Sequence, residues 1–274
     1  MERKEVKKMY AREITEASKS ALLEIGLELK RYRNDIVLSG GWAPYFITNG
    51  YFEHCGSIDI DLVLRTKIMK KYDTIKNSIL RIGYVEENPF RFSRTVKSPI
   101  DEKDYAVRLD FLCDKEGAKY VNLKSIQEDL QAFSFEGLNI AFEFNFEQEI
   151  KTVLPNNGEA KTQLRVIDLV GSLALKGQAL DGRAKVKDAY DIYALTHYGG
   201  GSEKAADYFN KTVSNKKLSA ETKALLIHSV SVVKEKFRNA NQSGPFQVES
   251  FSEGRFKRNI VAMQVNQFLD QIKI

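Results

Sequence analysis

Residues 39–64 read SGGWAPYFITNGYFEHCGSIDIDLVL, a Gly-Gly turn followed, after a spacer, by two aspartates inside an apolar run. Residues i and i+2 of a β-strand project from the same face, so Asp59 and Asp61 should lie together while their apolar neighbours point into a core. Two adjacent carboxylates repel each other, and a divalent cation relieves that repulsion. Because Mg²⁺ is often held by one or two carboxylates together with substrate phosphates, this strand predicts metal and nucleotide binding.

The Gly-Gly turn is expected to hold the phosphates of the nucleotide. Glycine lets a backbone approach a ligand closely, so Ser39, Gly40 and Gly41 would cradle a triphosphate. A helix over residues 42–49, with Gly41 at its start, would direct backbone N–H groups at an anion. Ser57, just before the aspartates, joins the predicted nucleotide-binding residues. The alternative is a plain strand-to-helix turn, which the downstream aspartate pair disfavours.

A third carboxylate lies in a later strand-like segment, residues 107–112. Alternation places Asp110 on the same face as Arg108, and if this strand lies beside the first, three carboxylates converge. Three carboxylates suit two metal ions, which can clamp the attacking and leaving oxygens of a phosphoryl transfer. Asp110 is then either a third metal ligand or the base that accepts a proton from the attacking hydroxyl. The alternative is a salt bridge to Arg108 or Arg65.

Charged residues further along the chain extend the candidate site. Lys176 lies in an apolar helical segment, where a lysine needs an anion or must extend its ammonium to water. Arg183 suits bidentate contacts with phosphate. Asp188 and Asp191 are three residues apart and share one helix face, and the sequence leaves their relative roles open. The alternative for the segment around them is a charged surface helix with internal ion pairs.

The ordered motifs over residues 34–198 resemble one family. They are Gly-Gly, Asp-x-Asp, a later single Asp, the lysine of LKGQAL, and the segment RAKVKDAYDIYAL. Together they are similar to the polymerase-beta-like nucleotidyltransferase superfamily, and in particular to its AbiEii/AbiGii type, known mainly as toxins of toxin–antitoxin systems. The resemblance implies that Lys176 contacts the nucleotide phosphates and that Asp188 is functional. It also implies tRNA as acceptor and a cognate antitoxin.

The resulting functional hypothesis is a toxin that is a nucleotidyltransferase using Mg²⁺ (or Mn²⁺). It would move a nucleoside monophosphate from an NTP onto an acceptor, tRNA by the resemblance, and release pyrophosphate. The seventeen residues between Gly41 and Asp59 predict a loop around residues 49–56 that touches the base or the acceptor. One alternative is a nucleotidyltransferase acting on a small molecule or a protein. The other is a non-catalytic nucleotide-binding partner protein, which the full set of carboxylates disfavours.

Composition and charge are those of a soluble protein, with 43% hydrophobic and 29% charged residues. No run approaches the ~18 apolar residues of a membrane span, and the N-terminus lacks the apolar core of a secretory signal. Cys55 and Cys113 form no disulfide or metal framework, so we expect a cytoplasmic protein. Residues 201–274 carry twelve Lys or Arg and seven Asp or Glu, which equals the net charge of +5 of the whole chain. This excess indicates either an RNA-binding surface or a solvated helical one.

The predicted fold class is α/β (α+β), a nucleotidyltransferase-type mixed β-sheet with flanking helices followed by a helical C-terminal domain. The domains are expected over residues 1–155 and 156–274, because the composition changes near a Pro-Asn-Asn-Gly turn. The three histidines show no metal-ligand spacing and receive no role. We expect strands over 35–39, 58–64, 90–96 and 104–114 with more in 131–146, and helices over 4–33, 42–49, 66–81, 164–181, 184–198, 202–213, 218–238 and 254–271.

Overall fold

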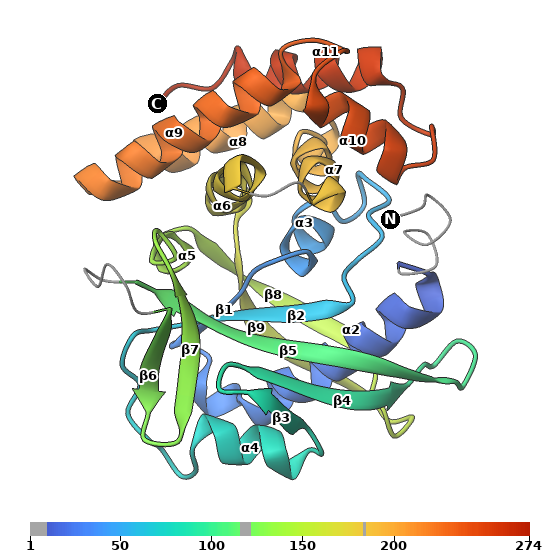
Figure 1. Cartoon of the computed structure of the whole chain (residues 1–274), viewed down its shortest axis with the longest axis vertical. Helices are drawn as coiled ribbons and strands as arrows, with labels where there is room; N and C mark the ends of the chain where they lie inside the picture. Colours follow the sequence, from blue (N-terminus) through green and yellow to red (C-terminus); the bar gives the residue numbers. More distant parts are fainter. Residues whose placement is uncertain (1–9, 116–121, 183–184) are drawn as a thin grey trace. The chain divides into compact units, whose positions relative to one another are not determined.

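The computed structural model describes residues 10–115, 122–182 and 185–274 (Figure 1). Within these, the chain divides into two compact units. The sheet unit contains residues 10–43 and 55–167, and the helical unit contains residues 44–54 and 168–274. Neither unit is continuous in sequence, because the segment 44–54 leaves the sheet unit between the Gly-Gly turn and the aspartate strand. The predicted domain division at residue 155 stays a prediction.

The sheet unit is built on one mixed β-sheet, which confirms the predicted fold class. In the described residues its nine strands follow the order β3-β4-β5-β2-β1-β9-β8, and β7 adds to β5 with β6 outside it (Figure 1). The central pair, β2 and β5, is parallel, and β4 pairs antiparallel with β5. The strands are β1 Ile36–Leu38, β2 Asp59–Leu64, β3 Val85–Asn88, β4 Arg91–Lys97, β5 Asp104–Asp114, β6 Leu123–Gln127, β7 Leu130–Phe135, β8 Asn145–Val153 and β9 Glu159–Ile167.

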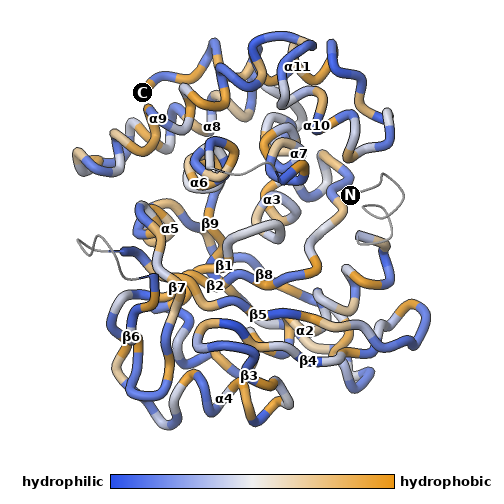
Figure 2. The backbone as a smooth tube through the Cα atoms, viewed as in Figure 1, coloured by the Kyte–Doolittle hydropathy of each residue, from blue (hydrophilic) through white to orange (hydrophobic). Residues whose placement is uncertain are grey.

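Alternation along β2 and β5 explains why their aspartates share a face. In β2, Ile60 and Leu62 are buried, and in β5, Leu109 and Phe111 are buried. Hydrophobic and hydrophilic residues follow one another along β5 (Figure 2). Because side chains alternate between the faces of a strand, the aspartates project from the face opposite to these apolar residues.

The helix α2 (Arg12–Glu28) packs on this sheet, contacting β4, β5, β8 and β9. It is shorter than the helix predicted over residues 4–33. In the described residues it begins at Arg12, and a separate 3-10 turn, η1 (Lys30–Tyr32), follows it. Periodicity alone does not locate such an end, because the apolar spacing continues through the 3-10 turn.

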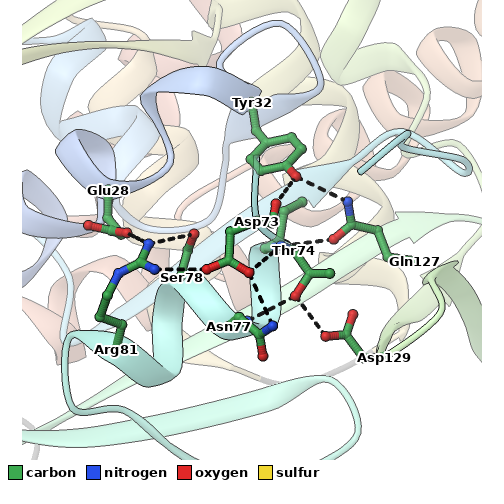
Figure 3. Close-up of polar contacts among 10 residues, drawn as sticks. Glu28, Tyr32, Asp73, Thr74, Asn77, Ser78, Arg81, Gln127 and Asp129 are labelled. Atoms are coloured by element: carbon green, nitrogen blue, oxygen red, sulfur yellow. Dashed lines mark hydrogen bonds and ion pairs between the residues drawn. The ribbon is translucent and has the colours of Figure 1, made fainter. Parts of the chain in front are cut away.

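The helix predicted over residues 66–81 is wrong in its first half, since α4 spans only Ile75–Arg81. Thr74 has extended backbone angles and its Oγ1 accepts a hydrogen bond from the N–H of Asn77 at 3.1 Å, so it caps the helix at that point. Tyr72, in the part of this segment that is not helical, is 82% exposed. Figure 3 shows the polar contacts at the start of α4, in which Asp73 accepts hydrogen bonds from Asn77 and Arg81 and the Thr74 hydroxyl donates to Asp129.

The composition change near residues 155–158 marks a hairpin turn between β8 and β9. Asn157 has a positive φ of 67°, and the N–H of Leu154 donates to the carbonyl of Gly158 at 2.7 Å. The helix predicted from residue 164 therefore begins later, at Leu169, because residues 159–167 form β9. The predicted strand region 131–146 contains β7, the short helix α5 (Ile140–Glu143) and the start of β8.

The helical unit consists mainly of helices packed on α6 and α7. Gly177 lets α6 approach α9 closely, since a Cβ at this position would lie 2.7 Å from the backbone oxygen of Ser229. The hydroxyl of Ser229 donates to the carbonyl of Ala174 at 2.7 Å across the same contact. The helices of the helical unit are α6 Leu169–Gly182, α7 Val186–Leu195, α8 Ser202–Ser214, α9 Ala220–Phe237, α10 Ser243–Phe251 and α11 Arg258–Leu269, with a 3-10 turn η2 (Tyr198–Gly200) before α8. Helix α3 (Trp42–Ile47) begins in the sheet unit and continues into segment 44–54.

Helix α10 has no counterpart among the predicted helices, because Gly244 and Pro245 near its start indicate a loop. Proline is tolerated in the first turn of a helix, where no internal donor is lost. None of the helices in the described residues combines the length and the apolar character that crossing a bilayer requires.

Candidate functional site

The Gly-Gly turn and Asp61 form one local site in the sheet unit. The turn follows β1, and the N–H of Ser39 donates to the backbone carbonyl of Asp61 at 2.9 Å. Gly40 has a positive φ of 64°, and a Cβ there would lie only 1.8 Å from Oδ2 of Asp61. Only glycine fits this position, because both its backbone conformation and its contact with the carboxylate exclude a side chain. The turn therefore lies directly against one of the predicted metal-binding carboxylates.

The parallel pairing of β2 and β5 brings the third predicted carboxylate beside the first two. Asp61 is in register with Asp110, and Asp59 is in register with Arg108. Asp59 and Asp61 are partly exposed, whereas Asp110 is 8% exposed. Ser57, immediately before β2, is buried. The residues that sequence predicts from the turn and from both strands thus belong to one region of the sheet unit.

Asp110 is held by an arginine that sequence reasoning missed. Arg91 in β4 donates from Nε to Oδ1 of Asp110 at 2.7 Å and from Nη2 to Oδ2 at 2.6 Å. These hydrogen bonds, together with the negative charges of Asp110 and Asp59, raise the pKa of Arg91 despite partial burial. The salt-bridge alternative was right about an ion pair but wrong about its partner, which is neither Arg108 nor Arg65. Nothing in the spacing along the chain indicates Arg91, because the contact is made between neighbouring strands.

The donor set fits a divalent cation through two carboxylates. Across the part of the chain that the structure describes, no three His, Cys, Asp or Glu side chains are arranged to hold a metal ion. Asp59 and Asp61 nevertheless share one face of β2, and the Gly40 turn packs directly against the Asp61 carboxylate. Mg²⁺ commonly takes its remaining ligands from water and substrate phosphates. Both oxygens of Asp110 accept hydrogen bonds from Arg91. The role of Asp110 as a third metal ligand therefore stays a prediction.

A second cluster of predicted residues lies inside the helical unit. Lys176 of α6 places its Nζ 2.9 Å from Oδ1 of Asp188 and 2.6 Å from Oδ2 of Asp191, both in α7. Lys187 places its Nζ 2.8 Å from Oδ1 of Asp191. All four side chains are largely or fully buried. Lys176 therefore does not extend into solvent, and the ion pairs foreseen for a surface helix are buried ones.

Mutual charge compensation keeps Lys176 and Asp191 ionised. Burial opposes the charge of Lys176, but Asp191 and Asp188 hold the pKa of its ammonium above the ordinary value. Burial likewise opposes the charge of Asp191, yet Lys176 and Lys187 hold its pKa well below the ordinary range. Buried charges of this kind persist only when they are paired and hydrogen-bonded. The cluster thus joins α6 to α7 through Lys176, which pairs with Asp188 and Asp191, while Lys187 pairs with Asp191 within α7.

His54 completes this cluster, although sequence reasoning gave it no role. Its Nε2 lies 2.9 Å from Oδ1 of Asp191, and both side chains are fully buried. Burial and the charge of Lys187 lower the pKa of His54 to about 4, so the ring is neutral at pH 7. Since a carboxylate oxygen only accepts, Nε2 must carry the hydrogen that it donates to Asp191. The two residues are 137 positions apart in sequence, so no local pattern connects them.

The long spacer after the Gly-Gly turn supplies His54 and an aromatic contact to the helical unit. Phe52 stacks on Phe256 with ring centroids 5.4 Å apart and also contacts Tyr190 and Tyr193 of α7. Part of the long spacer therefore serves to pack Phe52 against aromatic side chains of the helical unit. Contact of this loop with a base or an acceptor stays a prediction, and Arg183 lies outside the described residues.

The chain matches the family model described as nucleotidyl transferase AbiEii toxin, type IV TA system, over residues 21–273. Among solved structures, JHP933 from Helicobacter pylori is similar with 14% identity and a TM-score of 0.41, covering 93% of this chain and 92% of that chain. A candidate nucleotidyltransferase from H. pylori gives 13% identity and a TM-score of 0.39, covering 92% and 94%. No curated protein matches the chain.

The match to the family model spans nearly the whole chain and includes the turn, both aspartate strands and the buried lysine–aspartate cluster. The two structural similarities are too weak to add to it. The chain therefore belongs to the AbiEii family of nucleotidyltransferase toxins from type IV toxin–antitoxin systems.

Proposed function

We propose that this nucleotidyltransferase moves a nucleoside monophosphate from an NTP to an RNA acceptor, tRNA being the first candidate. The observation that carries the proposal is the contact between the Gly40 turn and the Asp61 carboxylate, beside Asp110 in the next strand. An acceptor hydroxyl would attack the α-phosphorus, the bond to the β-phosphate oxygen would break, and pyrophosphate would leave. Such transfer depends mostly on positioning and on neutralising charge.

Asp59 and Asp61 would hold Mg²⁺ or Mn²⁺, and the bound cation would neutralise phosphate charge as the leaving group departs. The backbone of the Gly-Gly turn would hold the β- and γ-phosphates. The N–H of Ser39 already donates to Asp61, so Ser39 would contribute its hydroxyl, and the N–H groups of Gly40 and Gly41 would contact the phosphates. Ser57 is proposed to support the nucleotide from the start of β2.

Asp110 is proposed as the base that takes the proton from the acceptor hydroxyl. Both of its oxygens accept hydrogen bonds from Arg91, so this role requires the arginine to move away from at least one of them. Lys176 and Asp188 are proposed to act as a buried pair that fixes α6 against α7. Contact of Lys176 with phosphate stays a prediction, and it would require an anion to replace its carboxylate partners.

The test is transfer from each of the four α-³²P-NTPs, with Mg²⁺, into purified tRNA and into total RNA. Wild type would be compared with Asp59→Asn/Asp61→Asn, which keeps side-chain volume, and with Asp181→Asn, which alters an exposed aspartate in α6. We expect label in tRNA for wild type and for Asp181→Asn only. Equal labelling by the double variant would contradict the assigned site. Metal-dependent NTP binding without any labelled RNA would redirect the search to protein or small-molecule acceptors.

A further inference from the structure

Two segments of the sheet unit form an exposed basic surface with an aromatic ring on it. Residues 30–33 contain three cationic side chains, and all three are exposed. Residues 65–72 contain four more, Arg65, Lys67, Lys70 and Lys71, which are also exposed. We call residues 30–33 and 65–72 together the Tyr72 surface. Its seven cations contrast with the C-terminal region, where twelve cations and seven carboxylates are spread over residues 201–274.

The two segments are held together by direct contacts. The Nζ of Lys71 donates to the carbonyl of Arg31 at 2.5 Å and lies 5.0 Å from the ring centroid of Tyr32. The guanidinium of Arg31 lies over the ring of Tyr72, 4.9 Å from its centroid. These contacts make one continuous surface from two parts of the sequence.

The loop is connected to a polar network at the start of α4, part of which is drawn in Figure 3. The N–H of Lys71 donates to the hydroxyl of Tyr32 at 3.0 Å, and that hydroxyl donates to the carbonyl of Asp73. Thr74 donates from Oγ1 to Asp129 at 2.7 Å, and the side chain of Gln127 also reaches the tyrosine hydroxyl. A loop tied at its base in this way keeps its outer side chains in place without burying them.

Most of the positive charge on the Tyr72 surface is not neutralised. Asp35 lies 3.2 Å from Lys71 and 3.9 Å from Arg65. Asp73 instead pairs with Arg81 of α4 at 2.8 Å and therefore contributes little at the surface. Within the described residues, the structure gives no carboxylate partner to the remaining five cations, at positions 30, 31, 33, 67 and 70. Clustered cations of this kind favour a polyanion through release of its counterions.

Two large side chains stand exposed among these cations. Tyr72 is 82% exposed and Met69 is 74% exposed, whereas Ile68, which precedes Met69 in the sequence, is buried. Arg31 covers one face of the tyrosine ring, which leaves the other face accessible. Exposed aromatic rings beside a basic groove stack on bases of single-stranded nucleic acid. A loop that inserts into a membrane would need more apolar surface than these two side chains provide.

We propose that the Tyr72 surface binds single-stranded RNA, with its cations on the phosphates and Tyr72 stacked on one base. The inference deepens the proposed function, because it gives the RNA acceptor a binding surface. It remains testable without catalysis, since binding can be measured in the absence of NTP.

The test measures binding of fluorescein-labelled oligouridine to the full chain by anisotropy, between about 50 and 200 mM salt. We expect Tyr72→Ala to weaken binding by about tenfold and Tyr72→Phe to leave it within about twofold, because phenylalanine retains the stacking ring. We expect Lys67→Gln/Lys70→Gln to lower the slope of log affinity against log salt by about 1.4, the contribution of two single-strand phosphates. The matched control is Lys204→Gln/Lys223→Gln, which removes two exposed charges from α8 and α9.

Unchanged binding by Tyr72→Ala, or an equal loss in the α8/α9 control, would overturn the proposal. Tyr72-dependent binding to vesicles of phosphatidylcholine with phosphatidylglycerol, with RNA binding unaffected, would assign the surface to a membrane instead. If no NMP transfer occurs while Tyr72-dependent RNA binding persists, the proposed function fails and this inference stands. If NMP transfer to RNA occurs and neither transfer nor RNA binding depends on Tyr72, the proposed function stands and this inference fails.

Discussion

Removing one charge from the buried cluster of the helical unit should destabilise that unit strongly. In Asp191→Asn the side chain keeps its volume, so no cavity forms, but one of the two negative charges is lost. Lys187 then loses a carboxylate 2.8 Å from its ammonium, and Lys176 loses one at 2.6 Å. Breaking a buried ion pair from one side typically costs about 3–5 kcal/mol, because the remaining charge stays buried without compensation. That cost is a large fraction of the total stability of an ordinary domain.

The assay is urea unfolding followed by far-UV circular dichroism at 222 nm, where helices dominate the signal. Fluorescence of Trp42, the one tryptophan of the chain, follows the sheet unit in the same samples. Asp181→Asn is the matched control, because Asp181 is 53% exposed and lies 3.5 Å from an equally exposed His228. We expect a change within about 0.5 kcal/mol for this control. A loss below about 1 kcal/mol in Asp191→Asn would refute the conclusion that the cluster holds α6 and α7 together.

Acid titration provides an independent check on the same residue. The lysines hold the pKa of Asp191 below its ordinary value of 3.8. A depressed carboxyl pKa contributes stability above the ordinary pKa, and that contribution is lost as the pH falls below it. Wild type should therefore lose helical-unit stability below about pH 4 more steeply than Asp191→Asn does. Parallel acid profiles for the two proteins would show that Asp191 is not ionised in the folded chain.

Three further predictions concern other residues. Gly40→Ala should weaken Mn²⁺ binding, measured by electron paramagnetic resonance, by more than about tenfold, because the new Cβ would overlap the Asp61 carboxylate. The control is Gly50→Ala, which also places alanine at a positive φ, here 82°, but has nothing within 4 Å of its Cβ. This control protein should bind Mn²⁺ as wild type does. Arg91→Gln should tighten Mn²⁺ binding by about tenfold, since it releases the carboxylate that Arg91 holds, and weaker binding would show that the arginine supports the site. His54 has a pKa of about 4 when folded and 6.5 ordinarily, so unfolding takes up a proton between these values and stability should fall by up to about 3 kcal/mol on acidification through that window; an unaltered pH slope in His54→Gln would contradict this.

Much of the catalytic sheet could be predicted from local pattern. The two-residue period of the apolar positions places Asp59 and Asp61 on one face of β2, and the structure confirms the strand and its buried neighbours. The same alternation predicts the strand that contains Asp110, and the structure confirms it as part of β5. Such patterns are reliable because burial of one strand face constrains every second residue.

Local pattern failed where competing contacts were made by distant parts of the chain. The spacing of Ile68, Tyr72 and Ile75 looks helical, yet Thr74 caps α4 and the network through Tyr32 and Gln127 holds the preceding loop open. The resulting exposure of Tyr72 could not be inferred from its sequence neighbours.

The sequence by itself determined the family, the two-aspartate strand, the Gly-Gly turn before it and the existence of a later lysine and aspartate helix pair. It did so because these features repeat with the period of a strand or helix, or because they form an ordered motif. Only the tertiary structure decided that Arg91 holds Asp110 and that His54 donates to Asp191. The physical reason is that a buried charge pairs with whichever opposite charge lies close to it in the folded chain, because desolvation makes an unpaired buried charge costly. The separation of the two residues along the sequence does not indicate which residues will pair.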